Sequence, residues 1–152
     1  MAEVERSGSR GDAVSAGFRP LAGYIFARER GGDSIAMTAP VTQTPEGEGT
    51  WLVRFIMPQR YALEDLPGPA SEDVSLRELE PQRMAAIRFS GRATDATVEE
   101  HERRLRAWMA DQGLEASGEP VYAYYDDPMT PGFLRRNEVL IPVESGSGAQ
   151  AP

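Results

Sequence analysis

The hydrophobic pattern near the start of the chain predicts a helix followed by a strand. Apolar residues recur at helical spacing over residues 12–28 and therefore share one face, namely Val14, Phe18, Leu21 and Ile25. Asp12 is a suitable N-cap, and Pro20 inside this stretch predicts a kink or a break into two short helices. A strand is expected over residues 35–43, after a pair of glycines that ends the helix.

The rest of the chain alternates between strand and helix patterns. Residues 50–57 give the clearest strand, because apolar side chains occupy every second position and Pro58 follows directly. A second helix is expected near residues 96–112, where Thr97 and Glu100 have capping-box spacing, although Thr94 or Asp95 could be the cap instead. Further strands are predicted over residues 74–79, 83–90, 120–126 and 135–143.

The two halves of the chain can be superimposed by a single shift of 84 residues. This shift lays the helix 12–28 on 96–112, the segment 35–43 on 119–127, and 55–58 on 139–142. One offset that aligns a helix, a strand and a proline-terminated strand indicates a duplicated β-α-β-β unit. Strand 83–90 maps onto positions −1 to 6, so its first-half counterpart is expected to be cut short at Met1.

These elements predict an α+β fold. Two pseudo-repeated β-α-β-β units would form a distorted β-barrel or curved mixed sheet flanked by two helices. A cleft between such halves is a common place for a small-molecule pocket. Residues 1–143 are expected to form one domain, and the small, polar tail 144–152 is expected to be disordered.

Composition and charge narrow the range of functions. The 152 residues contain no cysteine, which excludes disulfides and thiolate metal sites. The formal net charge is −8 and all 16 basic residues are arginine, so general binding to nucleic acid is not expected. No run of 18 apolar residues and no apolar signal segment occur, so a cytoplasmic protein without membrane partners is predicted, and a monomer is expected.

Catalytic motifs give little support for an enzyme. The chain has no nucleotide-binding loop, no HExxH, no GxSxG and no paired histidines. A small hydrolase that uses Tyr125 or Glu138 in a closed pocket is the weaker hypothesis.

Five motifs in order and spacing resemble one family. They are GFRPLAGYIF (17–26), IAMTAPV (35–41), FIMPQRY (55–61), RFSG (88–91) and YDDPMTPGFLRRNEV (125–139). Together they resemble the SOUL/haem-binding protein family over about residues 13–143. The resemblance implies a distorted β-barrel built from two related halves and flanked by two helices, an architecture similar to the effector-binding modules of certain bacterial transcription activators.

The resemblance also implies a haem or porphyrin pocket on the inner face of the first helix, closed by the loop before the last strand. Carried over by position, the implied contacts are Phe18, Leu21, Ala22, Ile25, Tyr125 and Met129. A porphyrin is a flat apolar plate that aromatic and aliphatic side chains can cover. Its propionates favour arginine, and the nearest arginines in the sequence are Arg19, Arg28 and Arg135.

Several of these residues have an ordinary structural explanation as well. His101, the sole histidine, lies in the second helix outside the implied pocket, where it is expected to bond a carboxylate such as Glu100 or Glu102 rather than iron. The apolar face of the first helix could be core instead of pocket. Tyr125 could fill the barrel, donate to a propionate or ligate iron, and the Arg135–Glu138 segment could form an internal ion-pair network instead of an anion site.

The sequence therefore predicts a protein that binds haem or a related tetrapyrrole without histidine ligation, for buffering or transfer. The alternative is an effector-binding module for other hydrophobic small molecules. In that case an acidic pocket would favour cations.

Overall fold

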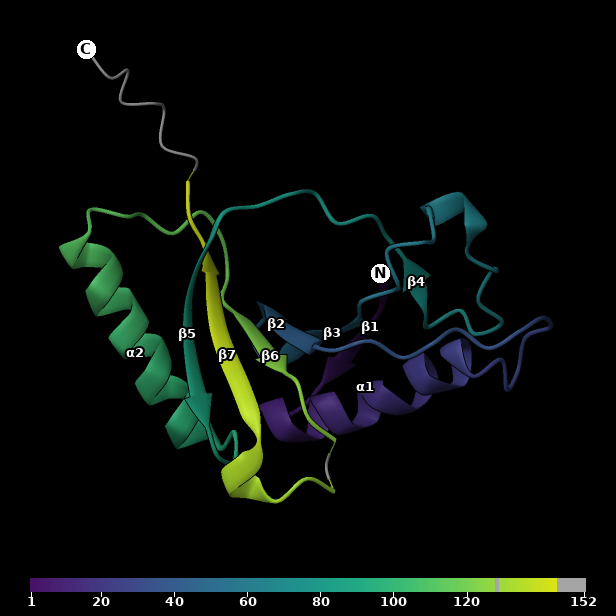
Figure 1. The fold of residues 1–152 in the computed structure, drawn as a ribbon, viewed down its shortest axis with the longest axis horizontal. Helices are drawn as coiled ribbons and strands as arrows, with labels where there is room; N and C mark the ends of the chain where they lie inside the picture. Colours follow the sequence, from purple (N-terminus) through teal and green to yellow (C-terminus); the bar gives the residue numbers. More distant parts are fainter. Residues whose placement is uncertain (128, 145–152) are drawn as a thin grey trace, which may run out of the picture.

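Alternating apolar residues form the seven strands of one sheet, which the computed structural model describes over residues 1–127 and 129–144 (Figure 1). Two α-helices and two short 3₁₀ helices, η1 and η2, complete this α+β fold. In chain order the elements are β1 (Ala2–Ser7), α1 (Arg10–Ile25), β2 (Val41–Gly47), β3 (Thr50–Phe55), η1 (Leu63–Asp65), β4 (Ser75–Leu76), β5 (Met84–Ser90), α2 (Asp95–Asp111), β6 (Val121–Tyr124), η2 (Gly132–Leu134) and β7 (Arg136–Pro142).

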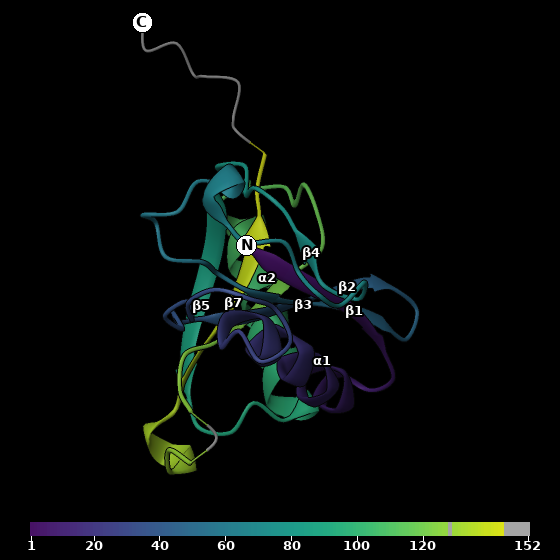
Figure 2. The ribbon, with the colours of Figure 1, turned by 90° about the vertical axis from the view of Figure 1, so that its right-hand side faces the viewer.

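The sheet is open and entirely antiparallel, which corrects the prediction of a barrel or a mixed sheet. Its strand order is β4-β1-β3-β2-β6-β7-β5, and the outer strands β4 and β5 do not pair with each other within the described part of the chain. In Figures 1 and 2 the strands of the first half are turned strongly relative to β5 and β7, so the sheet curves as a barrel would. Strand twist accumulates across a sheet in this way without closing it.

Each half of the chain contributes the same order of elements. The series β1, α1, β2, β3 is repeated as β5, α2, β6, β7, and the two halves join where β2 pairs with β6. Equivalent strands occupy equivalent places on either side of this seam, as expected for halves related by a two-fold axis. The prediction that the first strand is cut short was wrong, because β1 pairs with β3 over six residue pairs.

Several boundaries differ from the predictions. Ser9, whose Oγ accepts the Asp12 N–H, caps α1, so the helix begins two residues early. It continues unbroken past Pro20, since the carbonyl that loses its partner belongs to Ala16, which is exposed to water. Residues 35–40 form no strand, and β4 is much shorter than the predicted strand at 74–79.

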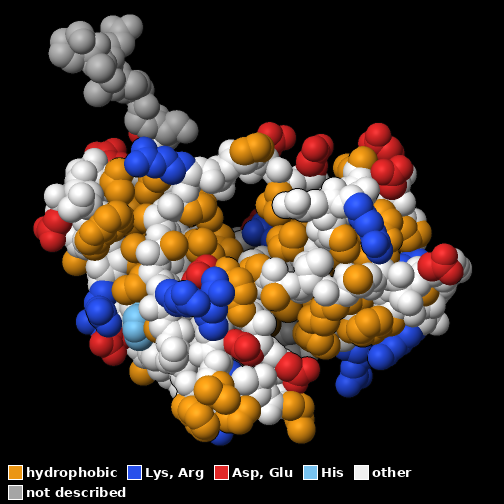
Figure 3. All heavy atoms as spheres, viewed as in Figure 1, with side chains coloured by type: hydrophobic (Ala, Val, Ile, Leu, Met, Phe, Trp, Pro, Cys, Tyr) orange, Lys and Arg blue, Asp and Glu red, His pale blue; other side chains and the backbone are white. Residues whose placement is uncertain are grey.

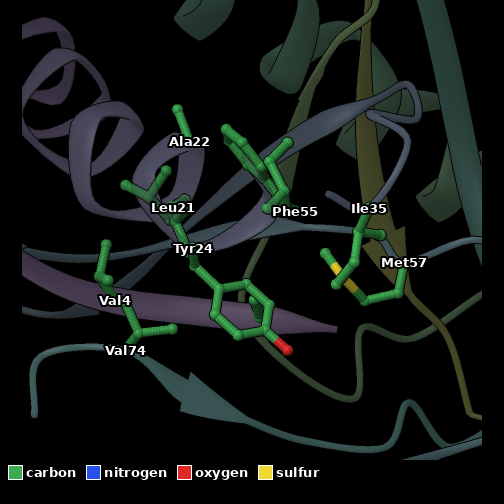
Figure 4. Close-up of a cluster of buried hydrophobic side chains, with 11 residues drawn as sticks. Val4, Leu21, Ala22, Tyr24, Ile35, Phe55, Met57 and Val74 are labelled. Carbon is green, nitrogen blue, oxygen red and sulfur yellow. The ribbon is translucent and has the colours of Figure 1, made fainter. Parts of the chain in front are cut away.

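Both helices pack on the same face of the sheet. Val4, Val53, Gln43, Tyr122 and Val139 follow one another across paired strands and therefore point to one side. On that side α1 closes a first core with β1 and β3, part of which Figure 4 shows. A Cβ added to Gly17 of α1 would lie only 2.8 Å from the Cβ of Val53 in β3. The second helix closes a separate core with β5 and β7.

Two further findings concern the C-terminal segment and the helices. Glu144 N–H donates to the carbonyl of Glu115, whereas the rest of the tail that was predicted to be disordered lies outside the described residues. Within the described part, neither helix is long and apolar enough to cross a membrane.

Candidate functional site

A cleft of about 850 Å³ lies between the two halves, on the helix side of the seam. It is bordered by the beginning of α1, the segment that leads into β2, the residues just before α2, and the loop between β6 and β7. A volume of this size lies within the range of about 300–1,000 Å³ that is typical of small-molecule and cofactor sites.

One wall of the cleft is apolar. It is formed by Val14 and Phe18 of α1 together with Met37 and Val41, and the Phe18 ring rests edge-on against Phe55 with 5.2 Å between ring centroids. Phe18 keeps 37% of its surface exposed, although it belongs to a helix whose neighbouring apolar residues are buried. An aromatic ring that is held by a core residue and still partly exposed can cover a flat ligand.

The floor of the cleft is polar and joins the two halves. The Arg10 guanidinium donates to Asp95 Oδ1 at 3.0 Å, to the Tyr124 hydroxyl at 2.8 Å and to the Ala93 carbonyl. The Tyr124 hydroxyl donates in turn to Gln43 Oε1 at 2.9 Å. Burial raises the pKa of Tyr124, so its phenol stays protonated and remains a hydrogen-bond donor at neutral pH.

The rim of the cleft carries both signs of charge. Arg92 and Arg135 lie on it, and Arg135 Nε donates to the Thr130 carbonyl at 2.9 Å. The carboxylates of Asp126 and Asp127 also border it, but Asp126 accepts the backbone N–H of Arg136 at the start of β7, and Asp127 accepts that of Met129 in the loop. With Arg10 included, the lining holds three arginines and two aspartates, so the acidic pocket that would favour cations is not what the structure shows.

Three residues predicted from the first helix lie elsewhere. Leu21, Ala22 and Ile25 are buried in the first core and do not border the cleft. They are covered by side chains from neighbouring elements, including Ile35 and Met57. Figure 4 shows Leu21 and Ala22 in this core. The apolar stripe of α1 continues without interruption from the cleft into the core. The spacing of apolar residues therefore could not distinguish cleft-lining residues from core residues.

Of the arginines and the methionine that the sequence suggested as ligand contacts, some border the cleft and others lie elsewhere. Arg28 is exposed, with its guanidinium 5.6 Å from the Phe26 ring centroid, and Arg19 borders a different hollow. Met129 is 89% exposed. Phe133 and Leu134 in η2 are also mostly exposed, and Figure 3 shows hydrophobic side chains at the surface there. Of the residues predicted to contact a ligand, Phe18, Tyr125 and Arg135 are brought together at the cleft.

Tyr125 borders the cleft, but its hydroxyl is directed to the opposite face of the sheet. There it donates to Glu138 Oε2 at 2.6 Å, and the Arg136 guanidinium lies 4.2 Å from its ring centroid. Burial, followed by the hydrogen bond to Glu138, raises the pKa of Tyr125. A neutral phenol is a poor iron ligand and a poor nucleophile, so this geometry favours a structural or donor role.

His101 lies away from the cleft, on α2. Its ring stacks on Phe89 with 4.1 Å between centroids, and Nδ1 donates to the Thr97 carbonyl at 2.7 Å rather than to Glu100 or Glu102. Over residues 1–127 and 129–144, no group of three or more His, Asp or Glu side chains could hold a metal ion. Any iron ligand supplied by the cleft lining would have to come from a residue such as Met37.

The sequence reasoning missed Arg10 and Arg92, which border the cleft from the starts of the two helices. The 84-residue shift contained the signal, because it lays Arg10 on Thr94 and so relates the two helix starts. In halves related by a two-fold axis, equivalent positions near the axis face each other. By this rule the starts of α1 and α2, and with them Arg10 and Arg92, would be expected at the seam.

Solved structures share this fold at low sequence identity. An uncharacterized conserved protein from Listeria innocua superimposes with a TM-score of 0.63 at 14% identity, over 94% of this chain and 86% of that one. A hydrolase from Listeria innocua gives 0.64 at 13% identity, also over 94% and 86%. SAV2435 bound to tetraphenylphosphonium gives 0.51 at 16% identity, over 95% and 89%.

Sequence comparison identifies the family. No curated protein matches the chain. Residues 1–142, which include both halves and every element of the sheet, match the family described as SOUL heme-binding protein. The chain therefore belongs to the SOUL heme-binding protein family.

Proposed function

We propose that the cleft between the halves binds haem or a related tetrapyrrole without histidine ligation, for buffering or transfer. The observation that carries this proposal is the cleft of about 850 Å³ with an apolar wall and arginines at its rim, in a chain of this family. Haem would supply a planar, redox-active iron centre, and the residues below would hold its macrocycle and its carboxylates.

The apolar wall suits a flat aromatic plate. Val14, Phe18, Met37 and Val41 offer aliphatic, aromatic and thioether surface, and each Å² of apolar area removed from water contributes about 25 cal/mol. Phe18 is already partly exposed at the cleft and held by Phe55, so little reorganisation of its side chain is needed when a ligand binds.

The rim suits the propionates. Arg92 and Arg135 are well placed to pair with them, since a guanidinium binds a carboxylate through two parallel hydrogen bonds. Arg10 already donates to three partners and is better placed to hold the floor. Arg19 and Arg28, which the sequence also suggested, do not border the cleft.

Hemin titration of paired glycine variants tests the site. Gly11 borders the cleft, and a Cβ added there meets no atom within 4 Å, so Gly11→Trp should fill the cleft while leaving α1 intact. Gly23→Trp is the matched control, since Gly23 lies in the same helix, is equally open and faces away from the cleft. We expect a saturable Soret shift in the wild type and in Gly23→Trp, and its loss in Gly11→Trp. Equal titration of the two variants would reject the cleft as the haem site.

A cationic hydrophobic ligand is the second candidate. SAV2435, which shares the fold, was solved with tetraphenylphosphonium, and Asp126 and Asp127 give this cleft some negative charge. Arg92→Met separates the two proposals, because removing a rim cation should weaken hemin binding and strengthen tetraphenylphosphonium binding. Competition titrations in wild type and variant measure both, and preference of the wild type for tetraphenylphosphonium over hemin would favour the cationic ligand.

Hydrolysis is a weaker third candidate. The Tyr125–Glu138 hydrogen bond is the feature that favours it, and one protein of similar fold is named a hydrolase. Because Glu138 lies on the face of the sheet opposite the cleft, Glu138→Gln should leave the binding of a cleft ligand unchanged, and loss of turnover in this variant would favour hydrolysis. If wild-type protein leaves bound ligands chemically unaltered, this candidate has no support.

A further inference from the structure

A second hollow, of about 310 Å³, lies on the other side of α1 from the cleft. It is bordered by the helix around residues 16–24, by Arg6 at the end of β1 and by residues 69–71 and 74 of the loop before β4. Figure 1 shows this loop and β4 on the same side of the molecule as the C-terminal half of α1. Three arginines border the hollow, namely Arg6, Arg19 and Arg30.

Arg30 is held in place without being neutralised. Its Nε donates to the Tyr24 carbonyl at 2.7 Å, and its two terminal nitrogens donate to the carbonyls of Gly31 and Asp33 at 3.0 Å each. The guanidinium also lies 5.0 Å from the Tyr24 ring centroid. All three acceptors are uncharged backbone groups, and a guanidinium has five N–H donors, so positive charge and further donors remain for a ligand.

The other two arginines add charge that is not fully balanced. Arg19 is exposed and makes no hydrogen bond or ion pair with any described residue. Arg6 pairs with Asp73 at 3.0 Å, but that carboxylate side chain is 61% exposed and screened by water. Glu29 is the one acidic residue among those that border the hollow. A local excess of positive charge in a chain of net charge −8 indicates an anion site.

The remaining wall is mainly apolar. Ala16 and Pro20 face Pro69, Ala70 and Val74 across the hollow. We propose that this hollow is a second binding site, for a small organic anion that carries a carboxylate or phosphate on an apolar body. The arginines bind the anionic group in the two-pronged geometry that guanidinium offers, and the proline and alanine surface covers the body.

Amide chemical shifts of the full chain during titration with phenyl phosphate and benzoate test this site. We expect saturable shifts at residues 16–24 and 70–74 with both anions and none with benzyl alcohol, their neutral counterpart. Arg19→Ala should raise the dissociation constant about five- to tenfold, since it removes a charge-assisted contact at a partly exposed site. Arg104→Ala, at an exposed position on α2, is the control and should leave the dissociation constant unchanged.

Two more variants test the site by changing its charge and its volume. Glu29→Gln should tighten binding of both anions, and Gly23→Trp should abolish it by filling the hollow, where a Cβ meets no atom within 4 Å. The proposal is overturned if Arg19→Ala and Arg104→Ala bind the anions equally, if benzyl alcohol produces the same shifts, or if the shifts map to the cleft. None of these outcomes depends on whether the cleft binds haem.

Discussion

The two ends of α1 have the same hydrophobic periodicity and different surroundings. Near its start, Val14 and Phe18 border an open cleft, whereas Leu21 and Ile25 are fully buried one and two turns later. The difference arises outside the helix, because Ile35, Met57 and Val74 cover the later turns and the seam between the halves leaves the earlier ones open. An apolar stripe therefore identifies the face that is turned inward, but not whether protein or ligand covers it.

The largest expected effect contrasts Leu21 with Phe18. Leu21→Ala should lower the free energy of unfolding by about 2–5 kcal/mol, because it leaves a cavity in the first core, and should leave hemin affinity of the folded protein unchanged. Phe18→Ala should cost less stability and weaken hemin binding, since its ring is partly exposed at the cleft. Denaturant unfolding and hemin titration of both variants measure the contrast. The reverse pattern would show that the boundary between core and cleft is misplaced.

Two glycines of the same helix sharpen the comparison. A Cβ at Gly17 would lie 2.8 Å from the Cβ of Val53, so Gly17→Ala should destabilise the protein by about 1–3 kcal/mol. Gly11→Ala faces open space and should stabilise it by up to about 1 kcal/mol through helix propensity. Thermal unfolding of the two variants in one buffer checks the sign of each change. Similar shifts of the melting temperature would contradict the difference in packing.

Arg10 tests the floor of the cleft, where the start of α1 contacts the second half. Arg10→Met should lower the free energy of unfolding by about 1–3 kcal/mol, because the Tyr124 hydroxyl and the Ala93 carbonyl lose a charged donor. Asp95→Asn is the control, and it should cost less than about 1 kcal/mol because its carboxylate side chain is 68% exposed. Urea unfolding curves compare the variants, and an equal loss in both would assign the effect to the ion pair alone.

The smallest expected change in stability concerns Tyr122, which belongs to the core beneath α2. Burial, and then the hydrogen bond to Glu102, raise its pKa, so the folded state favours the neutral phenol. Its contribution to stability is complete below the unfolded-state pKa of about 10 and is lost as the pH rises beyond that value. Tyr122→Phe should cost about 1 kcal/mol at pH 7 and make the decline in stability above pH 10 shallower. Urea unfolding between pH 7 and 11 measures this, and parallel curves would contradict it.

Much of the fold could be predicted from the sequence, because local patterns decide it. Alternation placed β3, β5 and β7 within one or two residues, and the 84-residue shift revealed the two-fold order of the sheet. The strand predicted at residues 35–40 is absent because Ile35 is buried against the end of α1. Its N–H donates to the Ile25 carbonyl and not to a neighbouring strand. Closure of the sheet depends on accumulated twist and register, which residue types do not specify.

The candidate site was less predictable because it forms where distant segments meet. Phe18 and Arg135 were reached through the family resemblance, and both border the cleft. Arg10 and Arg92 come together only when the two halves pair across β2 and β6, so no local pattern marks them. Leu21 and Phe18 differ in the residues that cover them, and those residues are 14 or more positions away in the chain.

The short ladder between β2 and β6 has a consequence for how the cleft can vary. Only three residue pairs join these strands, whereas β5 and β7 share seven. A small rotation at this junction changes the distance between the two helix starts and leaves both hydrophobic cores intact. Substitutions at the junction would therefore change the width of the cleft without altering the residues of the two cores.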